Sequence, residues 1–257
     1  MIKCIDVKKS FGENEVLKGI STEFEAGKCN LIIGLSGAGK TVMLKLLVGL
    51  MQPTSGKIMY DDRVFGELSD DALRSLRMEV GMLFQGSALF DSMTVQENVL
   101  FPLEMFSPKT KAEQLDRVNN VLERVNLEGA NHKYPSEISG GMQKRVGIAR
   151  AIVLEPKYLF CDEPNSGLDP KTSMVIDELI QGITYDNNIT TVINTHDMNS
   201  VMEIGDNINL LHLGKLVWRG NKSEVLTSDN EFLDNFIFAS PFLQRLRAQA
   251  LGRTHGA

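Results

Sequence analysis

The chain has 257 residues, of which 42% are hydrophobic and 23% charged, values typical of a globular protein that buries its own core in one or two packed units. Its net charge of −6 lacks the basic balance of a nucleic-acid binder, so we expect no nucleic-acid partner.

The cysteines and the apolar stretches narrow the choice of compartment. Cys4, Cys29 and Cys161 are far apart and form no CxxC pair, which argues against a disulfide framework or a zinc site and favours a reducing cytosol. The opening MIKCIDVKKSFG lacks the apolar region of a secretory signal, and the stretch 43–51 is far shorter than the roughly 20 apolar residues that span a bilayer. We therefore expect any membrane role to depend on a partner.

The first third of the chain predicts strands around a glycine-rich loop. The apolar run 28–33 predicts a strand, the glycines after it a loop, and the periodic segment 41–50 a helix. A turn at Pro53 leads into another short strand, and 80–84 is a further strand candidate.

A helical insert is expected next, because strand signals are few from residue 87 to about 154. One of its helices is predicted over about 109–125, with four apolar residues on one face: Leu115, Val118, Leu122 and Val125.

Strand signals return in the last part of the chain, in 157–163, 190–197 and 207–220, with a helix over about 172–183. Strands that alternate with helices imply a parallel sheet with right-handed crossovers. The tail from about residue 228 is predicted to be helical. Its end has three arginines and apolar residues at helical spacing, which suit packing on its own chain, contact with a partner copy, or fraying: Phe242, Leu243, Leu246, Ala250 and Leu251.

Residues 34–41, GLSGAGKT, match the phosphate-binding pattern G-x-x-x-x-G-K-[ST] and lie between a predicted strand and a predicted helix, as the pattern requires. Glycines let backbone N–H groups converge on phosphate oxygens, Lys40 reaches the β and γ phosphates, and the Thr41 hydroxyl can ligate Mg²⁺. Val42 offers only its N–H where many related loops have a second hydroxyl. The predicted phosphate-binding residues are Gly34, Ser36, Gly37, Ala38, Gly39, Lys40, Thr41 and Val42.

The strand 157–163 ends in two acids, Asp162 and Glu163. The carboxyl ends of parallel strands meet at the edge where the phosphate loop opens, so both carboxylates are expected where Mg²⁺ would sit. Asp162 suits Mg²⁺, directly or through water, and Glu163 suits orienting or deprotonating the attacking water. Without the phosphate loop, such a strand end would usually be only a solvated edge.

Ser139, Gly140 and Gly141 precede a well-patterned helix. Ser139 is a good N-cap and the glycines permit close backbone approach, so this helix start is suited to an anion. Occurring alone, it would be an ordinary capped helix.

Together these three motifs resemble the nucleotide-binding subunit of ABC transporters, over about residues 1–225. The resemblance implies an α/β fold of the P-loop NTPase class. This fold has a RecA-like parallel-sheet core (1–86 and 155–225) with an N-terminal antiparallel β subdomain, an inserted helical subdomain (87–154) and here a C-terminal helical tail (226–257). It also implies that residues 139–141 are the signature motif, which binds the γ-phosphate of ATP held by a second copy of the chain.

Other positions match the family singly. Gln85 matches the Q-loop glutamine, which touches Mg²⁺ and the attacking water, and His196 matches the switch histidine, which contacts the γ-phosphate. Phe11 takes the place of the adenine-stacking aromatic, more usually tyrosine, with Val16 as a further wall. The residues that match the D-loop, which crosses the dimer interface, are Ser166, Gly167 and Asp169. Outside this set, each would be an ordinary strand end, core residue or turn.

The resemblance implies a head-to-tail homodimer whose two ATP molecules lie between the copies. Lys40, Glu163, His196 and Gln85 would be the catalytic residues, with ATP and Mg²⁺ as cofactors and Thr41, Gln85 and Asp162 as metal ligands.

Three details narrow the resemblance: the signature is ISGGM rather than LSGGQ, the phosphate loop continues as GKTVMLK, and the second acid leads into EPNSGLDP. They are similar to the ATPase subunits of Mla/Mce-type transporters, which move phospholipids or related lipids across cell envelopes. This implies an integral membrane permease of the MlaE type, an indirect MCE-type lipid-binding partner, and a place at the cytoplasmic face of the inner membrane. The candidate permease contact is 86–98, with Leu89 and Phe90, although both could equally pack inside the insert.

Two other functions remain open. The same motifs would serve an importer of a polar solute such as an amino acid. A non-transport ABC protein acting on DNA or the ribosome would share the site, but such proteins carry coiled coils, zinc modules or a second cassette, and this sequence has one cassette and no cysteine pair.

Overall fold

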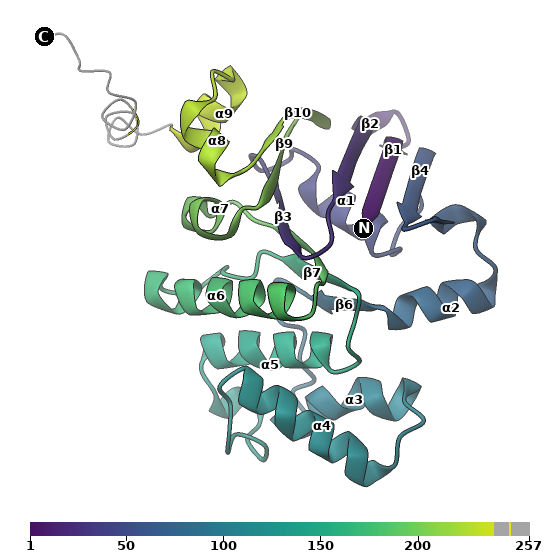
Figure 1. Cartoon of the computed structure of the whole chain (residues 1–257), viewed down its shortest axis with the longest axis vertical. Helices are drawn as coiled ribbons and strands as arrows, with labels where there is room; N and C mark the ends of the chain where they lie inside the picture. The colour runs from purple at the N-terminus through teal and green to yellow at the C-terminus, as the bar shows by residue number, and fades with distance from the viewer. Residues whose placement is uncertain (239–246, 248–257) are drawn as a thin grey trace, which may run out of the picture.

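The computed structural model describes residues 1–238 and Arg247, which form two sheets and the helices that cover them (Figure 1). The C-terminal segment 240–257, whose packing the sequence left open, lies outside the described residues except for Arg247. None of the described helices is both long and apolar enough to cross a membrane.

The first sheet is antiparallel and confirms the expected N-terminal β subdomain. Its strand order is β2-β1-β4-β5. The strands are β1 (Ile2–Phe11), β2 (Asn14–Phe24), β4 (Ser55–Tyr60) and β5 (Arg63–Val64).

The second sheet has the order β10-β9-β3-β8-β7-β6, and the five strands from β9 to β6 run parallel, as predicted. Its members are β3 (Lys28–Ile33), β6 (Val80–Leu83), β7 (Tyr158–Asp162), β8 (Thr190–Asn194), β9 (Asn207–His212) and β10 (Lys215–Gly220). The strand signals over 207–220 are confirmed, and they form two strands. Leu213 and Gly214 have φ values of 47° and 80°, and this left-handed turn folds the run into an antiparallel hairpin.

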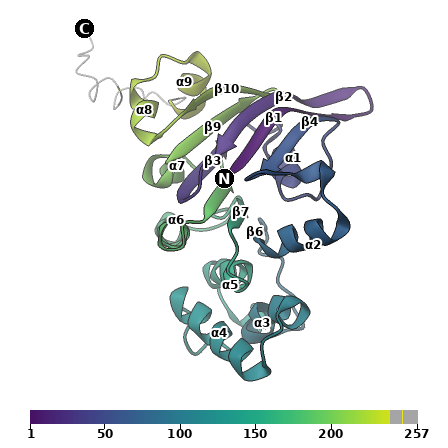
Figure 2. The ribbon, with the colours of Figure 1, turned by 45° about the vertical axis from the view of Figure 1, so that its right-hand side comes forward.

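Helices cover both faces of the parallel sheet, which explains why β3 is buried from Cys29 to Ile33 and apolar except for Asn30. One core cluster joins Leu31 and Ile33 to the helices α3 to α7, and the other joins Ile32 to α1, α2 and the antiparallel sheet. In Figures 1 and 2, α3 and α4 lie at the opposite end of the molecule from the antiparallel sheet. The helices are α1 (Lys40–Leu47), α2 (Asp70–Met78), α3 (Val95–Phe106), α4 (Lys111–Arg124), α5 (Gly140–Ile152), α6 (Pro170–Asp186), α7 (Met198–Ile204), α8 (Lys222–Thr227) and α9 (Glu231–Ile237), with 3₁₀ turns at Phe65–Glu67 and Pro135–Glu137.

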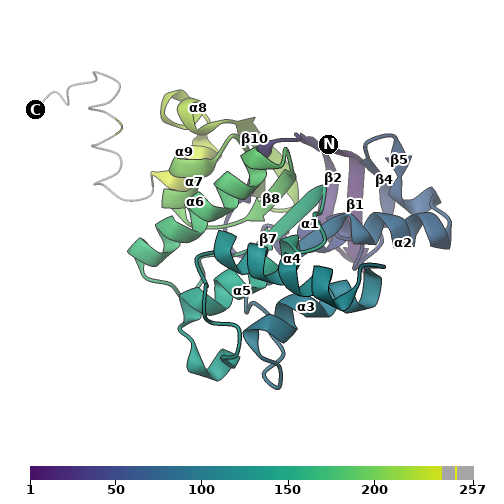
Figure 3. The ribbon, with the colours of Figure 1, turned by 60° about the horizontal axis from the view of Figure 1, so that its bottom comes forward.

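The expected helix over 109–125 is α4, which lies beside α3 and α5 in Figure 3. It begins after Thr110, whose side chain accepts the Glu113 N–H in a capping box. Val118, Leu122 and Val125 are buried as predicted, but Leu115 is only partly buried.

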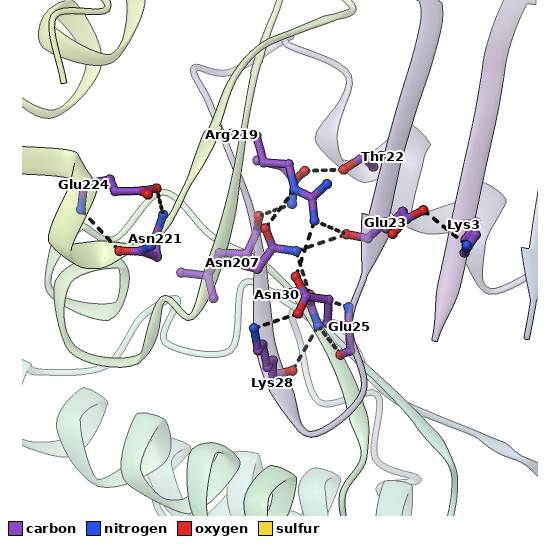
Figure 4. Close-up of polar contacts among 12 residues, drawn as sticks. Lys3, Thr22, Glu23, Glu25, Lys28, Asn30, Asn207, Arg219, Asn221 and Glu224 are labelled. Atoms are coloured by element: carbon purple, nitrogen blue, oxygen red, sulfur yellow. Dashed lines mark hydrogen bonds and ion pairs between the residues drawn. The ribbon is translucent and has the colours of Figure 1, made fainter.

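A buried polar network joins the two sheets (Figure 4). The Asn207 amide donates to the Glu23 carbonyl at 3.0 Å and to Asn30 Oδ1 at 2.9 Å, and Arg219 donates to Asn207 Oδ1 at 3.1 Å. Asn30 Oδ1 also accepts the Glu25 N–H at 2.8 Å. Because Asn30 and Asn207 are buried and hydrogen-bonded to each other and to β2, they fix how β2 sits against β3 and β9.

Candidate functional site

The phosphate loop connects β3 to α1, and its glycines are required by backbone geometry. Gly34, Gly37 and Gly39 have φ values of 144°, 80° and 102°, which other residues rarely adopt. A Cβ at Gly34 would lie 2.3 Å from the Leu211 carbonyl oxygen, and one at Gly39 would lie 2.6 Å from a Leu17 methyl carbon. Both glycines are therefore required by the left-handed backbone and by the close packing of the loop against Leu211 and Leu17.

The start of α1 is left open for an anion. Its N-cap is Gly39, which has no side chain to bond the first N–H groups, and the first turn contains no acidic residue. The free N–H groups and the positive end of the helix dipole therefore favour a phosphate.

Lys40 lies across this loop. Its Nζ donates to the Gly34 carbonyl oxygen at 2.8 Å. Burial lowers the pKa of Lys40, and the nearby carboxylates Glu163 and Asp162 oppose that shift. The cation is thus held between the loop and both predicted acids.

Glu163 follows β7 in a left-handed conformation, with φ of 49°. Its N–H donates to the Asn194 carbonyl at 2.8 Å, and its Oε2 lies 2.7 Å from His196 Nδ1. Such backbone strain costs about 1–3 kcal/mol and is often found at functional sites. The structure therefore brings the proposed base and the proposed switch histidine into direct contact.

These elements enclose a cavity of about 670 Å³, a size usual for ligand sites. Phe11 and Asp162 are not among the described residues that line it. Phe11 ends β1 with its side chain 45% exposed and Lys9 Nζ 5.1 Å from its ring centroid. The sequence did not predict Phe236 of α9 as a lining residue. The predicted residues that do line the cavity are Val16, Gly34, Ser36, Gly37, Ala38, Gly39, Lys40, Thr41, Val42, Gln85, Glu163 and His196.

The signature residues are not part of this cavity within one chain. Ser139 is the N-cap of α5, and its Oγ accepts the Met142 N–H at 3.3 Å. Ser139 and Gly140 are exposed. Gly141 has a packing role, because a Cβ there would lie 2.6 Å from the Thr172 methyl on α6.

The D-loop contacts the Q-loop, since Gln85 Nε2 donates to Ser166 Oγ at 3.3 Å. Asp169 is the N-cap of α6: its Oδ1 accepts the Thr172 N–H at 3.0 Å, and bonds from Thr172 lower its pKa. Gly167 is exposed between them. Their role in a dimer interface stays a prediction.

The sequence reading missed Lys144 of α5. This buried ammonium donates to the Gln85 carbonyl and, at 3.4 Å, to the Glu163 carbonyl, and burial lowers its pKa. The available signal was a lysine spaced with Gly141 and Ile148 on the buried face of a helix.

Asn194 was missed as well. It ends β8, and its Nδ2 donates to Asp162 Oδ1 at 2.6 Å, which fixes that carboxylate. The signal was a polar residue closing the apolar strand TTVIN.

The donors near the cavity suit a metal that arrives with a nucleotide. In the described part of the chain, no group of three or more His, Cys, Asp or Glu side chains forms a metal site. Thr41, Gln85 and Asp162 offer one hydroxyl, one amide and one carboxylate. Mg²⁺ is usually bound by one or two carboxylates together with water and substrate phosphates, so this small donor set fits it.

Comparison with known proteins decides the family. Residues 17–166 match the protein family described as ABC transporter. The chain belongs to this family. It is the ATP-binding subunit of an ABC transporter, and its expected fold class is confirmed.

Relatives of several kinds share this cassette. A probable ribonucleotide transport ATP-binding protein of Mycobacterium leprae is 40% identical over 91% of this chain and 68% of its own length. The chloroplastic protein TRIGALACTOSYLDIACYLGLYCEROL 3 of Arabidopsis thaliana is 36% identical over 93% of this chain and 74% of its own. A methionine import ATP-binding protein of Caulobacter vibrioides is 40% identical over 88% of this chain and 68% of its own length. The chain thus spans about two thirds of these relatives.

Among solved structures, the dimeric bacterial ABC transporter cassette MJ0796 has a TM-score of 0.79 at 32% identity, covering 86% of this chain and 99% of its own. The same cassette is also known in a post-hydrolysis state bound to ADP and Pi, with a TM-score of 0.77 at 33% identity. The chain is therefore an ATPase of the ABC family.

Proposed function

We propose that the chain works as a head-to-tail homodimer that powers lipid transport through a membrane permease. The carrying observation is that the phosphate loop, Glu163 and His196 line one cavity, while Ser139 and Gly140 stand exposed outside it. A second copy would bring its signature residues over the open side of the cavity. The dimeric MJ0796 cassette supports this arrangement.

Within that chamber the roles follow from geometry. Lys40 and the N–H groups at the start of α1 stabilise negative charge on the transferred phosphoryl group. Glu163 accepts a proton from the attacking water or orients it, and His196, 2.7 Å away, holds the carboxylate in place. Gln85 contacts the D-loop through Ser166, so changes at the phosphates reach that loop directly.

We infer that Thr41, Gln85 and Asp162 would hold a Mg²⁺ ion that accompanies ATP. When bound, it supplies positive charge that offsets the charge of the phosphates. Asn194 keeps Asp162 oriented through its bond of 2.6 Å.

A groove of about 500 Å³ supports docking of a permease. It lies between the parallel sheet and the helical insert, and exposed aromatic residues line it. Leu89 packs partly against the helical core, whereas Phe90 is 42% exposed and packs against Phe101 with ring centroids 5.1 Å apart and ring planes tilted by 60°. We therefore assign packing inside the insert to Leu89 and propose the permease contact for Phe90. The lining residues include Phe84, Phe90, Phe101, Pro102, Phe106, Arg74, Arg77 and Arg150.

Phe90→Asp is expected to abolish co-purification with the permease while ATP binding stays within about 2-fold of wild type. The substitution removes the aromatic contact, and desolvating a carboxylate on docking costs several kcal/mol. Pull-down of the affinity-tagged chain from solubilised membranes measures the effect. Met174→Asp is the matched control, because Met174 is 53% exposed on α6 and outside the groove. Undiminished permease binding by Phe90→Asp would remove the groove from the docking site.

The lipid substrate is supported by the ISGGM, GKTVMLK and EPNSGLDP details and by the relative named after a galactolipid. On this proposal the permease is of the MlaE type, an MCE-type protein binds lipid on the far side, and the chain sits at the cytoplasmic face of the inner membrane. The second candidate is an importer of a polar solute, which the methionine import relative favours.

One experiment separates the two candidates. We expect the chain, purified with its permease in detergent, to carry phospholipid that organic extraction and mass spectrometry detect above a detergent-only control. We also expect phospholipid vesicles, and not methionine or ribonucleotides, to stimulate its ATPase by at least about 2-fold. Stimulation by methionine with no response to lipid would replace the lipid proposal with the importer.

A further inference from the structure

Three buried polar side chains form a closed cluster outside the cavity. Asn165 Nδ2 donates to Asp177 Oδ1 at 2.9 Å and to Ser200 Oγ at 3.0 Å, and Ser200 Oγ donates to Asp177 Oδ2 at 2.7 Å. Asn165, Asp177 and Ser200 are 8%, 4% and 0% exposed. These bonds pair the Asn165 N–H₂ group, the carboxylate and the hydroxyl away from water, whereas the buried Asn165 Oδ1 has no hydrogen-bond partner among the described residues.

The cluster links the two segments that carry the reacting groups. Asn165 lies two residues after Glu163 and directly before the D-loop residue Ser166. Ser200 lies on α7, four residues after His196. Asp177 bridges them from α6, the helix that begins where the D-loop ends.

Burying the Asp177 carboxylate costs free energy. Burial raises the pKa of Asp177 from 3.8 to about 6, against the effect of the bonds from Ser200 and Asn165, and the carboxylates Asp197 and Glu203 of α7 raise it further. Cys29 and Cys161 are buried thiols whose pKa values are raised mainly by burial and further by the charge of Asp177. Packing alone does not require a charge here, because an apolar side chain would fill the space without the desolvation cost.

We propose that Asp177 is a positioning residue for ATP hydrolysis, which holds Asn165 and Ser200 together so that Glu163 and His196 keep one relative geometry. On this proposal Asp177 maintains the contact of 2.7 Å between His196 Nδ1 and Glu163 Oε2. Catalytic groups displaced by about 1 Å lose much of their rate enhancement, whereas the phosphate loop, which binds ATP, does not touch this cluster. Loss of the cluster should therefore lower kcat and leave KM unchanged.

The test compares two substitutions in the full-length chain. Asp177→Ala is expected to lower kcat for ATP hydrolysis by at least about 10-fold with KM within about 2-fold. Asp177→Asn is expected to keep at least about half of the wild-type kcat, because an amide can accept from Asn165 and donate to Ser200 Oγ. Ser200→Ala removes a single hydroxyl from the cluster and should lower kcat by about 3-fold, so the test survives if Asp177→Ala does not fold.

Thr184→Val is the matched control for general loss of stability. Thr184 is fully buried on the same helix and bonds Ile180 and Thr191, away from the cavity. We expect it to lower the melting temperature and to leave kcat unchanged.

Stability against pH gives a second readout. Because the folded-state pKa of about 6 lies above the ordinary value of 3.8, the favourable contribution is complete below about 3.8 and is lost as pH rises through about 6. The melting temperature of the wild type, relative to Asp177→Asn, should therefore fall between about pH 4 and about pH 7.

Three outcomes would overturn the proposal. Wild-type kcat in both Asp177→Ala and Ser200→Ala would show that the cluster positions nothing. Equal losses in Asp177→Asn and Asp177→Ala would assign the effect to the charge. A loss of kcat in Thr184→Val as large as that in Asp177→Ala would assign it to stability. None of these outcomes bears on the lipid substrate or the dimer, which have their own tests.

Discussion

Glu163→Gln is expected to slow ATP turnover by at least about 100-fold while ATP still binds, because a positioned general base contributes about 10²–10⁴-fold. The side chain is only 14% exposed and sits 2.7 Å from His196, so an amide of the same shape fits without rearrangement. It cannot accept a proton from water. Phosphate release under saturating Mg-ATP measures the loss, and equilibrium dialysis with labelled ATP measures the retained affinity.

The same variant tests the dimer. If hydrolysis opens a closed ATP dimer, blocking it should make the dimer accumulate, and light scattering should show a mass near twice that of the chain only when ATP is present. Glu155→Gln is the control, since Glu155 is also a glutamate in a left-handed conformation, with φ of 56°, but lies outside the cavity. Unchanged hydrolysis by Glu163→Gln, or full turnover by a strictly monomeric preparation of wild type, would contradict this account.

The central strands could be predicted because burial on both faces leaves a plain signal. In β3 every residue from Cys29 to Ile33 is buried, so the run is apolar except for Asn30 and ends at the glycine loop. Strand character over 207–220 was predicted, but not its division into β9 and β10, because only Leu213 and Gly214 separate the two strands. The helix α1 ends earlier than predicted, at Leu47, because Gly49 with φ of 76° terminates it.

Part of the site could likewise be predicted from local sequence, and part depends on contacts between residues far apart in the chain. The phosphate loop is contiguous in sequence, so its chemistry could be predicted from the eight residues 34–41. Asn194 meets Asp162 only because parallel β7 and β8 pair these two residues in register, and no local pattern specifies that register. Lys144 reaches two carbonyls that lie 59 and 19 residues away in sequence. Contacts of this kind depend on the order and register of the strands, so they could not be predicted from local sequence.

Lys40 combines structural and binding roles. Its ammonium bonds the Gly34 carbonyl at 2.8 Å and lies close enough to Glu163 and Asp162 for both carboxylates to raise its pKa against the effect of burial. It is therefore a half-buried cation that faces two acids, and an arriving triphosphate adds further negative charge on the same side. Charge-assisted hydrogen bonds of this kind are worth about 1.5–3 kcal/mol each.

Lys40→Ala is expected to weaken ATP binding by at least about 100-fold, which corresponds to about 3 kcal/mol, because the variant loses these bonds and leaves the phosphates facing two uncompensated carboxylates. Fluorescence titration with a labelled ATP analogue measures the affinity, and thermal melting confirms that the fold persists. Lys45→Ala is the matched control, since Lys45 is an exposed lysine in the last turn of the same helix and does not line the cavity. If Lys40→Ala bound ATP as tightly as Lys45→Ala, the loop would hold the nucleotide through backbone N–H groups alone, and Lys40 would have no part in binding.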